Sequence, residues 1–305
     1  MAAADAGQSQ PVEVAELSPY TRDTPIDTVA NDAAMGRWGR LIFPVERGFM
    51  GGTTLDDMNL TWYSAIDPDK TVELANWFHD QAVSGTQVFY DLYTDEEKAE
   101  DPDKEDTGLF FFRGEEGAPF AVWSAGGGFA YVAAMHDSFP HALELSKRGL
   151  NAFAVIYRPG AQTACEDLSR ALSFIFSHAD DLGVSLDGYL LGGGSAGARM
   201  SAWVASHGTE AFGEEALPQP ACVVTQYSGL RDWQPTDPAT FSNVGTNDGI
   251  ANWRTMQARR DQMAAAGIAT EFHVYEGLRH GFGLGTGTVA EGWLDQAIAF
   301  WGAAR

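Results

Sequence analysis

From residue 119 onward, short apolar runs alternate with longer segments whose apolar residues recur every three or four positions. Runs of the first kind are typical of buried strands, and segments of the second kind are typical of the helices that cover them. The predicted strands are residues 119–123, 152–157, 189–191, 222–227, 240–244 and 270–275. The predicted helices are residues 133–148, 165–178, 196–206, 250–265 and 289–304. This alternation predicts an α/β fold with a mostly parallel, twisted sheet of about eight strands flanked by helices.

The first third of the chain is less regular. Residues 71–83 have the apolar spacing of an amphipathic helix, and residues 87–93 and 108–112 have the β-rich composition of two further strands. Residues 94–106, between these strands, are rich in Asp and Glu. Asp106 stands where a calcium-binding EF-hand loop needs a glycine, so we expect a solvated hairpin loop rather than a calcium site.

Composition restricts the class of partner. The 305 residues include 42 acidic and 19 basic ones, which gives a formal net charge of −23. Such a charge repels nucleic acid and acidic membrane surfaces, and it disfavours strongly anionic substrates unless a local basic pocket compensates. A hydrophobic fraction of 45% supports a sizeable core. The sequence leaves the oligomeric state open.

Two further features concern redox chemistry and localisation. Cys165 and Cys222 match no disulfide, zinc or redox pattern, and we interpret them as buried apolar residues. No run of eighteen apolar residues is present, so no membrane insertion is expected. Residues 1–32 lack the features of a signal peptide and have the composition of a flexible acidic tail. We therefore expect a cytoplasmic protein, or a secreted or periplasmic one if an export signal has been removed.

The segment Gly193-Gly194-Ser195-Ala196-Gly197 lies between a predicted strand and a predicted helix. A serine hydroxyl is a poor nucleophile, and enzymes that use one present it on a tight strand-to-helix turn of the form G-x-S-x-G. In a chain with 34 glycines, the alternative is a Gly-rich turn without chemistry. The remaining motifs decide between these interpretations.

Partners for Ser195 follow later predicted strands. Asp248 comes after the strand at 240–244 and His280 after the strand at 270–275, which gives the chain order Ser, Asp, His. His280 would accept the serine proton, and Asp248 would orient the imidazole. Asp232 is the alternative acid, one strand earlier, and we prefer Asp248 because a helix and a strand then lead to the histidine. His273 falls within a strand, where a packed or surface histidine is the more common case.

The glycine run Gly126, Gly127 and Gly128 follows the first strand of the alternating region. Backbone N–H groups at such a run, with that of Ala196 after the serine, predict an oxyanion hole. This chemistry needs no cofactor and no metal ion. Aromatic residues near these motifs are candidates for substrate binding, and a place in the core is the alternative for each: Phe129, Tyr131, Trp233 and Phe282.

Taken together, these motifs resemble the α/β-hydrolase superfamily, in particular the esterase branch related to hormone-sensitive lipase and to bacterial acetyl and feruloyl esterases. The matching segments are Gly126-Gly127-Gly128-Phe129, Tyr157-Arg158 with Asp167, Gly194-Ser195-Ala196-Gly197, Gly245-Thr246-Asn247-Asp248 and His280-Gly281-Phe282. They span residue 120 to the end, about two-thirds of the chain. Ala125 stands where the family often has histidine before the glycines, which indicates a different subgroup.

The resemblance implies a division of the chain and an activity. Residues 85–305 would form the α/β-hydrolase catalytic domain, and residues 33–84 an N-terminal extension that could cap the site. The implied function is a serine carboxylester hydrolase acting on a small or medium acyl ester, with acetylated sugars among the candidates. A prolyl-oligopeptidase-like peptidase is an alternative, although the chain has no long β-rich propeller segment. A catalytically silent binding protein on the same fold is another.

Overall fold

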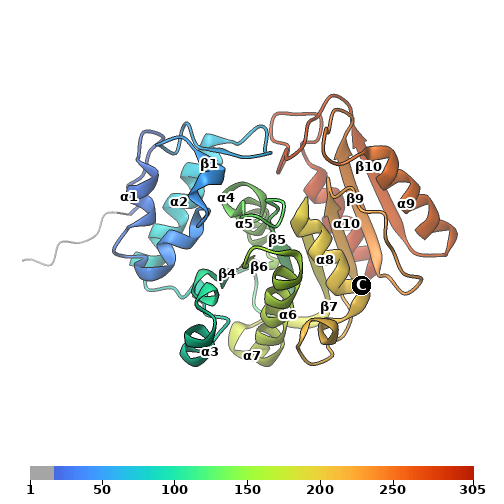
Figure 1. The fold of residues 1–305 in the computed structure, drawn as a ribbon, viewed down its shortest axis with the longest axis horizontal. Coiled ribbons are helices and arrows are strands. Elements are labelled where there is room, and N and C mark those ends of the chain that lie inside the picture. Colours follow the sequence, from blue (N-terminus) through green and yellow to red (C-terminus); the bar gives the residue numbers. More distant parts are fainter. Residues whose placement is uncertain (1–16) are drawn as a thin grey trace, which may run out of the picture.

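The computed structural model describes residues 17–305, and it is built around one eight-stranded sheet (Figure 1). The strand order is β10-β9-β8-β7-β5-β6-β4-β3, and the neighbours from β10 to β6 all run parallel. β4 pairs antiparallel with both β6 and β3 at the other edge. The predicted mostly parallel α/β sheet is therefore confirmed.

The strands of this sheet are β3 (Phe89–Tyr90), β4 (Gly108–Phe112), β5 (Pro119–Ser124), β6 (Asn151–Ile156), β7 (Ser185–Gly194), β8 (Cys222–Gln226), β9 (Ala239–Gly245) and β10 (Thr270–Tyr275). The helices that follow them are α4 (Ala134–Asp137), α5 (Phe139–Lys147), α6 (Ala161–Ser177), α7 (Ala179–Leu182), α8 (Ala196–His207), α9 (Trp253–Ala265) and α10 (Trp293–Ala304). One predicted helix is interrupted. The segment expected as a single helix over 133–148 breaks at Ser138, two residues before Pro140.

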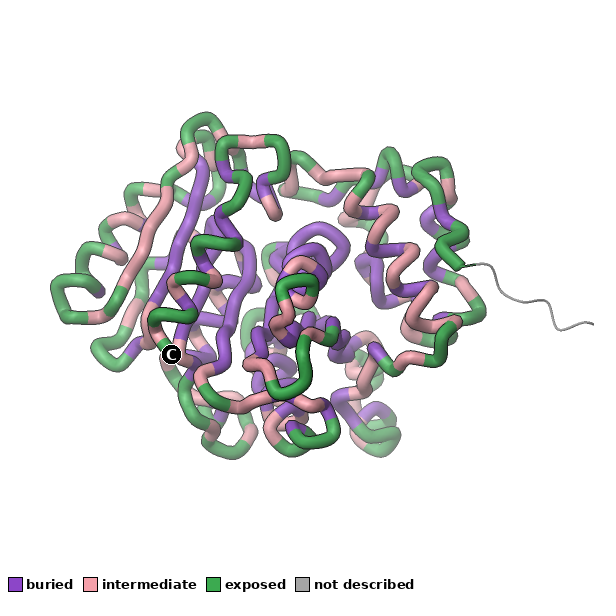
Figure 2. The backbone as a smooth tube through the Cα atoms, turned by 180° about the vertical axis from the view of Figure 1, so that it is seen from behind, coloured by how far each residue is buried: buried purple, intermediate pink, exposed green. Residues whose placement is uncertain are grey.

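Helices cover both faces of the sheet. α6 and α8 pack together on one face, while α5 and α10 pack on the other, where the Trp123 ring contacts both His141 of α5 and Trp293 of α10. The central strands are buried on both sides, and β10 at the edge is only partly covered (Figure 2). This layering leaves the loops at the carboxyl ends of the parallel strands on one side of the molecule, where ligand sites of such sheets form.

The N-terminal segment packs beside α4 and α5 at the left of Figure 1. It contains α1 (Ile26–Ala30), β1 (Met50–Gly51), β2 (Asn59–Leu60) and α2 (Pro68–Val83). Asp67 caps α2 by accepting the N–H groups of Asp69 and Lys70, and Pro68 occupies its first position, which confirms the predicted helix and extends it by one turn.

The expected flexible tail over residues 1–32 is wrong for residues 17–32. Ile26 and Val29 of α1 are buried, and the Tyr20 N–H donates to the Asn76 side chain of α2 at 2.8 Å. Apolar residues in this acidic stretch are spaced widely, and local composition does not reveal the contacts that bury them: α1 packs on the 3-10 helix Gly36–Ile42, and the Ile26 N–H donates to the Thr53 carbonyl at 3.0 Å. The first 16 residues of the predicted tail lie outside the described residues.

The acidic stretch 94–106 is also not the simple loop that we expected. It forms α3 (Asp95–Glu100) and a 3-10 helix (Pro102–Asp106) between the antiparallel strands β3 and β4. Thr94 and Glu97 form a reciprocal capping box, in which each side chain accepts the other residue's N–H. Thr-x-x-Glu is a helix-start signal, and here it outweighs the acidic composition.

No helix within residues 17–305 combines the length and the apolar composition needed to cross a bilayer.

Candidate active site

Ser195 lies on the turn between β7 and α8 in a conformation that non-glycine residues rarely adopt, with φ 52° and ψ −116°. Its N–H donates to the Gln226 carbonyl at 2.9 Å, which ties the turn to β8. A Cβ on Gly193 or Gly197 would lie 2.4 or 2.0 Å from the Ser124 carbonyl oxygen, so both positions need glycine. The sequence motif thus produces a strained turn that presents the serine at the end of β7.

The structure brings Ser195, His280 and Asp248 together. His280 Nε2 lies 2.9 Å from Ser195 Oγ, and His280 Nδ1 lies 2.8 Å from Asp248 Oδ2. Asp248 Oδ1 accepts the N–H groups of Ile250 and Ala251 at 2.8 and 2.7 Å, and its side chain is fully buried. Because a carboxylate can only accept, the proton of the neutral imidazole belongs on Nδ1, and Nε2 is free to accept from Ser195.

Asp232, the alternative acid, lies elsewhere. Its side chain is exposed and accepts a hydrogen bond from Trp203 Nε1 at 3.4 Å. His273 lies 2.6 Å from a Glu271 carboxylate oxygen on β10, away from Ser195. Neither side chain forms a hydrogen bond with Ser195 or His280 within residues 17–305.

The glycine run supplies fewer free donors than we expected. The Gly126 N–H donates to Asp137 Oδ2 at 2.7 Å, which removes it from the predicted oxyanion hole. Within residues 17–305, the N–H groups of Gly127, Gly128 and Ala196 have no hydrogen-bond acceptor. The candidate donors are therefore these three groups.

Asp137 is a fully buried carboxylate that the sequence analysis missed. Besides the Gly126 N–H, it accepts the Tyr63 hydroxyl at 2.7 Å and the Tyr227 hydroxyl. A Cβ on Gly194 would lie 2.4 Å from both carboxylate oxygens, so Asp137 occupies the space that a side chain before Ser195 would fill. Burial raises the pKa of Asp137, and the bonds to Tyr227, Gly126 and Tyr63 oppose that rise.

The segment that follows β2 reaches the site from the N-terminal part of the chain. Tyr63 contacts the glycine run, since a Cβ on Gly126 would lie 2.3 Å from its hydroxyl oxygen. The Ser64 hydroxyl donates to the His280 carbonyl at 2.6 Å. In Figure 1 this segment meets the loop after β10 at the top of the sheet. Trp62 packs over Gly128 and remains 45% exposed, so it forms part of the site's surface.

The four aromatic candidates have different surroundings. Phe129 is half-buried and stacks on Trp203 of α8, with ring centroids 5.8 Å apart. Tyr131 belongs to the core: it is fully buried, and its hydroxyl donates to the Thr61 carbonyl. Trp233 packs toward α9, where its Nε1 donates to Gln262. Phe282 is buried against Tyr227 and Tyr275.

Two other histidines lie behind the site. His136 Nε2 is 2.8 Å from the Gly281 carbonyl oxygen, so the residue beside Asp137 holds the loop that carries His280. His141 stacks on Trp123 in the core, and burial lowers its pKa to about 3. Among residues 17–305, the histidine that hydrogen-bonds to Ser195 Oγ is His280, and neither of these two does so.

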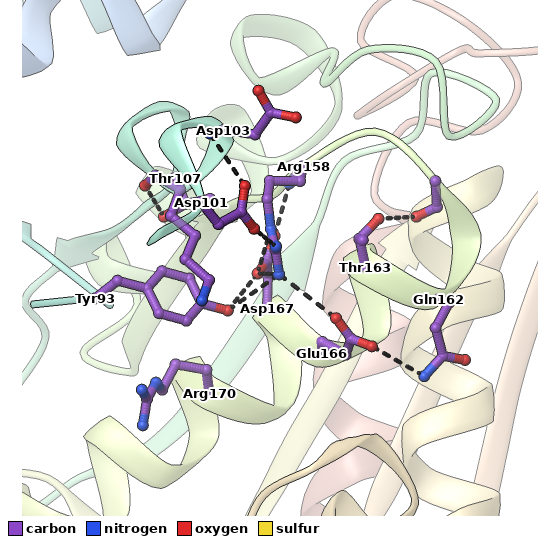
Figure 3. A network of polar contacts seen from close by, with 12 residues as sticks. Tyr93, Asp101, Asp103, Thr107, Arg158, Gln162, Thr163, Glu166, Asp167 and Arg170 are labelled. Carbon is purple, nitrogen blue, oxygen red and sulfur yellow. Dashed lines mark hydrogen bonds and ion pairs between the residues drawn. The ribbon is translucent and has the colours of Figure 1, made fainter. Parts of the chain in front are cut away.

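A buried ion-pair network supports the strand that precedes α6 (Figure 3). Arg158 lies between Asp167, which is fully buried, and Asp101, with nitrogen–oxygen distances of 2.7 and 2.5 Å. The Tyr93 hydroxyl donates to Asp167 from the other side. The neighbouring Tyr157 hydroxyl donates to the Ala125 carbonyl at 2.6 Å. The segment that follows β6 therefore fixes the residue that begins the glycine loop.

Comparison with solved structures identifies the fold. An esterase from the planctomycete Thermogutta terrifontis, solved with propionate bound, superimposes with a TM-score of 0.57 and 21% identity over 65% of this chain and 89% of that one. An acetyl ester-xyloside bifunctional hydrolase from Caldicellulosiruptor lactoaceticus superimposes with a TM-score of 0.58 and 19% sequence identity. The match covers 65% of this chain and 88% of that one. An α/β-hydrolase enzyme from a Medee basin deep-sea metagenome library superimposes with a TM-score of 0.55 and 20% sequence identity. The match covers 65% of this chain and 92% of that one.

The chain therefore has the α/β-hydrolase fold, as its motifs predicted. The sequence matches no known family profile, and no curated protein matches it.

Proposed function

We propose that this α/β-hydrolase-fold chain is a serine carboxylester hydrolase that acts on a small or medium acyl ester through an acyl-enzyme. One observation carries the proposal: His280 lies within hydrogen-bond distance of both Ser195 Oγ and the buried Asp248 carboxylate. Nucleophile, base and orienting acid are thus in the arrangement that activates a serine.

In the acylation step, Ser195 Oγ attacks the ester carbonyl carbon while His280 Nε2 accepts its proton. The Asp248 carboxylate stabilises the resulting imidazolium through Nδ1–H. The carbonyl oxygen becomes an oxyanion that accepts hydrogen bonds from the free N–H groups of Gly127, Gly128 and Ala196. His280 then gives its proton to the leaving alkoxy oxygen, and the alcohol departs as the acyl-enzyme forms.

In deacylation, His280 accepts a proton from water as its oxygen attacks the acyl carbonyl carbon. The same backbone donors stabilise the second oxyanion. Collapse of this intermediate breaks the bond to Ser195 Oγ, which recovers its proton from His280, and releases the carboxylic acid.

Asp137 would act as a positioning residue in this scheme. The Asp137 carboxylate accepts the Gly126 N–H and thereby orients the peptide groups of Gly127 and Gly128. The Tyr63 and Tyr227 hydroxyls donate to the same carboxylate and hold it in place. We also propose that residues 33–84 cap the site and that residues 85–305 form the catalytic domain. Trp62 over Gly128 and Ser64 against His280 support this assignment of the cap.

The experiment is a substrate panel with a matched variant. 4-Nitrophenyl esters of increasing acyl length, acetylated xylosides and peptide anilides are compared for the wild type and Ser195→Ala. The acetylated sugars are included because one structural neighbour is an acetyl ester-xyloside hydrolase. We expect ester turnover that Ser195→Ala abolishes. Anilide turnover above ester turnover would favour a peptidase, and no turnover of any substrate would favour a binding protein.

A further inference from the structure

A cavity of about 320 Å³ lies beside α8, one helical turn beyond Ser195. Its walls come from four segments: α8, the loop after β8, the loop after β9 and the first turn of α9. The wall residues that matter most are Arg199, Trp203, Gly229, Arg231, Asp232 and Ile250.

The same segments build the candidate active site. The Arg199 N–H donates to the Ser195 carbonyl at 3.2 Å, and the Ile250 N–H donates to Asp248 at 2.8 Å. Trp203 stacks on Phe129, which follows the glycine run. Arg199 follows Ser195 by four residues, and one helical turn rises about 5.4 Å, so a substrate with one end at Ser195 would have to extend by about this distance to place its other end at Arg199.

The cavity is basic in an acidic protein. The Arg199 Nε–H donates to the Ser228 carbonyl at 2.8 Å, which fixes the guanidinium and leaves its terminal nitrogens available. Within residues 17–305, neither Arg199 nor Arg231 has a carboxylate within 4.0 Å, whereas Arg158, for example, is held by three. Asp232 is the one carboxylate in the wall, so the two arginines leave the cavity with a net positive charge.

The geometry of the cavity suits a fixed anion. Buried Arg259 donates to the Asp232 carbonyl at 2.8 Å, so the loop that carries Arg231 is anchored. Trp203 and Ile250 add apolar surface to the wall beside the two guanidinium groups. A guanidinium with a free edge pairs with a carboxylate through two parallel hydrogen bonds.

We infer that this cavity binds a carboxylate carried by the ester substrate, so that the preferred substrates are esters with a free acid group. The inference rests on the proposed function. A chain with a net charge of −23 repels anionic substrates unless a local basic site compensates, and Arg199 and Arg231 form such a site.

Paired substrates test the inference and locate the carboxylate. On the acyl side, 4-nitrophenyl hydrogen glutarate is compared with 4-nitrophenyl valerate. On the alcohol side, 3-acetoxybenzoate is compared with phenyl acetate. The enzymes are the wild type, Arg199→Gln, Arg199→Lys and Arg231→Gln. The matched control is Arg254→Gln, because Arg254 is exposed, lies outside the cavity and has no carboxylate partner among residues 17–305.

In one of the two pairs, we expect the wild type to favour the charged ester in kcat/KM. Arg199→Gln should lower kcat/KM for that ester by about tenfold to a hundredfold and leave its neutral partner near the wild-type value. Arg199→Lys should retain part of the preference, and Arg254→Gln all of it. High salt should reduce the preference. Equal losses on charged and neutral esters in Arg199→Gln would mean that Arg199 only supports the Ser228 loop, and would overturn the inference, as would a wild type without any preference.

Calorimetric titration of glutarate into the wild type, Arg199→Gln and Arg254→Gln gives an answer that does not depend on turnover. Binding that Arg199→Gln abolishes and Arg254→Gln retains would support the cavity even if no ester is hydrolysed, in which case only the proposed function fails. Hydrolysis of neutral esters without glutarate binding or charged-ester preference would refute the cavity and leave the proposed function intact.

Discussion

Removing the Tyr63 hydroxyl tests how the N-terminal segment contributes to the site. Asp137 is fully buried and has three donors, of which Tyr63 is the one that comes from the N-terminal segment. Tyr63→Phe removes one hydrogen bond to a buried carboxylate and keeps the ring. Hydrogen bonds to charged groups contribute about 1.5–3 kcal/mol, so we expect the free energy of unfolding to fall by that amount.

The kinetic effect has an upper bound. Complete loss of one oxyanion donor typically costs about 3 kcal/mol of transition-state stabilisation. Tyr63→Phe leaves Gly126 and Tyr227 in place, so the glycine run loosens without losing a donor, and we expect kcat to fall roughly tenfold, well short of that bound. KM should stay near the wild-type value, because the loss falls on the transition state.

The pH dependence gives a second readout. Burial raises the pKa of Asp137, and the Tyr63 hydroxyl is one of the groups that lower it. Without that hydroxyl the pKa rises further. Protonated Asp137 no longer holds Gly126 as a charged acceptor, so the acid limb of the kcat profile should move to higher pH in Tyr63→Phe.

Tyr189→Phe is the matched control. The Tyr189 ring is buried and its hydroxyl donates to the Pro218 carbonyl at 2.8 Å, remote from Ser195. It should lose about 1 kcal/mol of stability and keep its kcat and its pH profile. If Tyr63→Phe has the same kcat and acid limb as Tyr189→Phe, the positioning role of Asp137 is refuted.

Three further predictions concern stability and reactivity. Arg158→Gln should lower the free energy of unfolding by about 3–5 kcal/mol in guanidinium titrations, because it leaves the Asp167 carboxylate buried without its cation; a change under 1 kcal/mol, the size of an exposed pair, would contradict this. Cys165 and Cys222, whose pKa burial raises to about 12, should resist iodoacetamide at neutral pH until the protein unfolds, as mass spectrometry of native and denatured samples would show. Glu144 bonds to Lys70, Lys147 and Arg148, which hold its pKa at about 2 against the opposing effect of burial. Since that folded-state pKa lies below its ordinary value of 4.5, its contribution to stability is present above pH 4.5 and is lost as the pH falls toward 2, so Glu144→Gln should flatten the stability profile in that window.

Much of the fold could be predicted from sequence because the alternation of strand and helix is a local pattern. The carboxyl ends of parallel strands meet at one edge, so Ser195, Asp248 and His280 could be placed near one another from their positions alone. Burial of both cysteines is confirmed: Cys222 lies in the apolar strand β8, and Cys165 lies on the buried face of the amphipathic helix α6.

Asp137 could not be found in this way. It lies in a short helix with no motif around it, and its role depends on the missing side chain of Gly194 and on Tyr63, 74 residues earlier. For the same reason, the sequence could not show that the Gly126 N–H is already bound. The one available signal was indirect: the extra glycine before Ser195 leaves a space that some other side chain had to fill.

Activation of Ser195 can be measured by intact-protein mass spectrometry after reaction with a fluorophosphonate, because the reagent forms a covalent bond with an activated serine. We expect one adduct on the wild type, mapped by peptide sequencing to Ser195, and none on Ser195→Ala under the same conditions. An unlabelled wild type, or an adduct that persists in Ser195→Ala, would contradict this expectation.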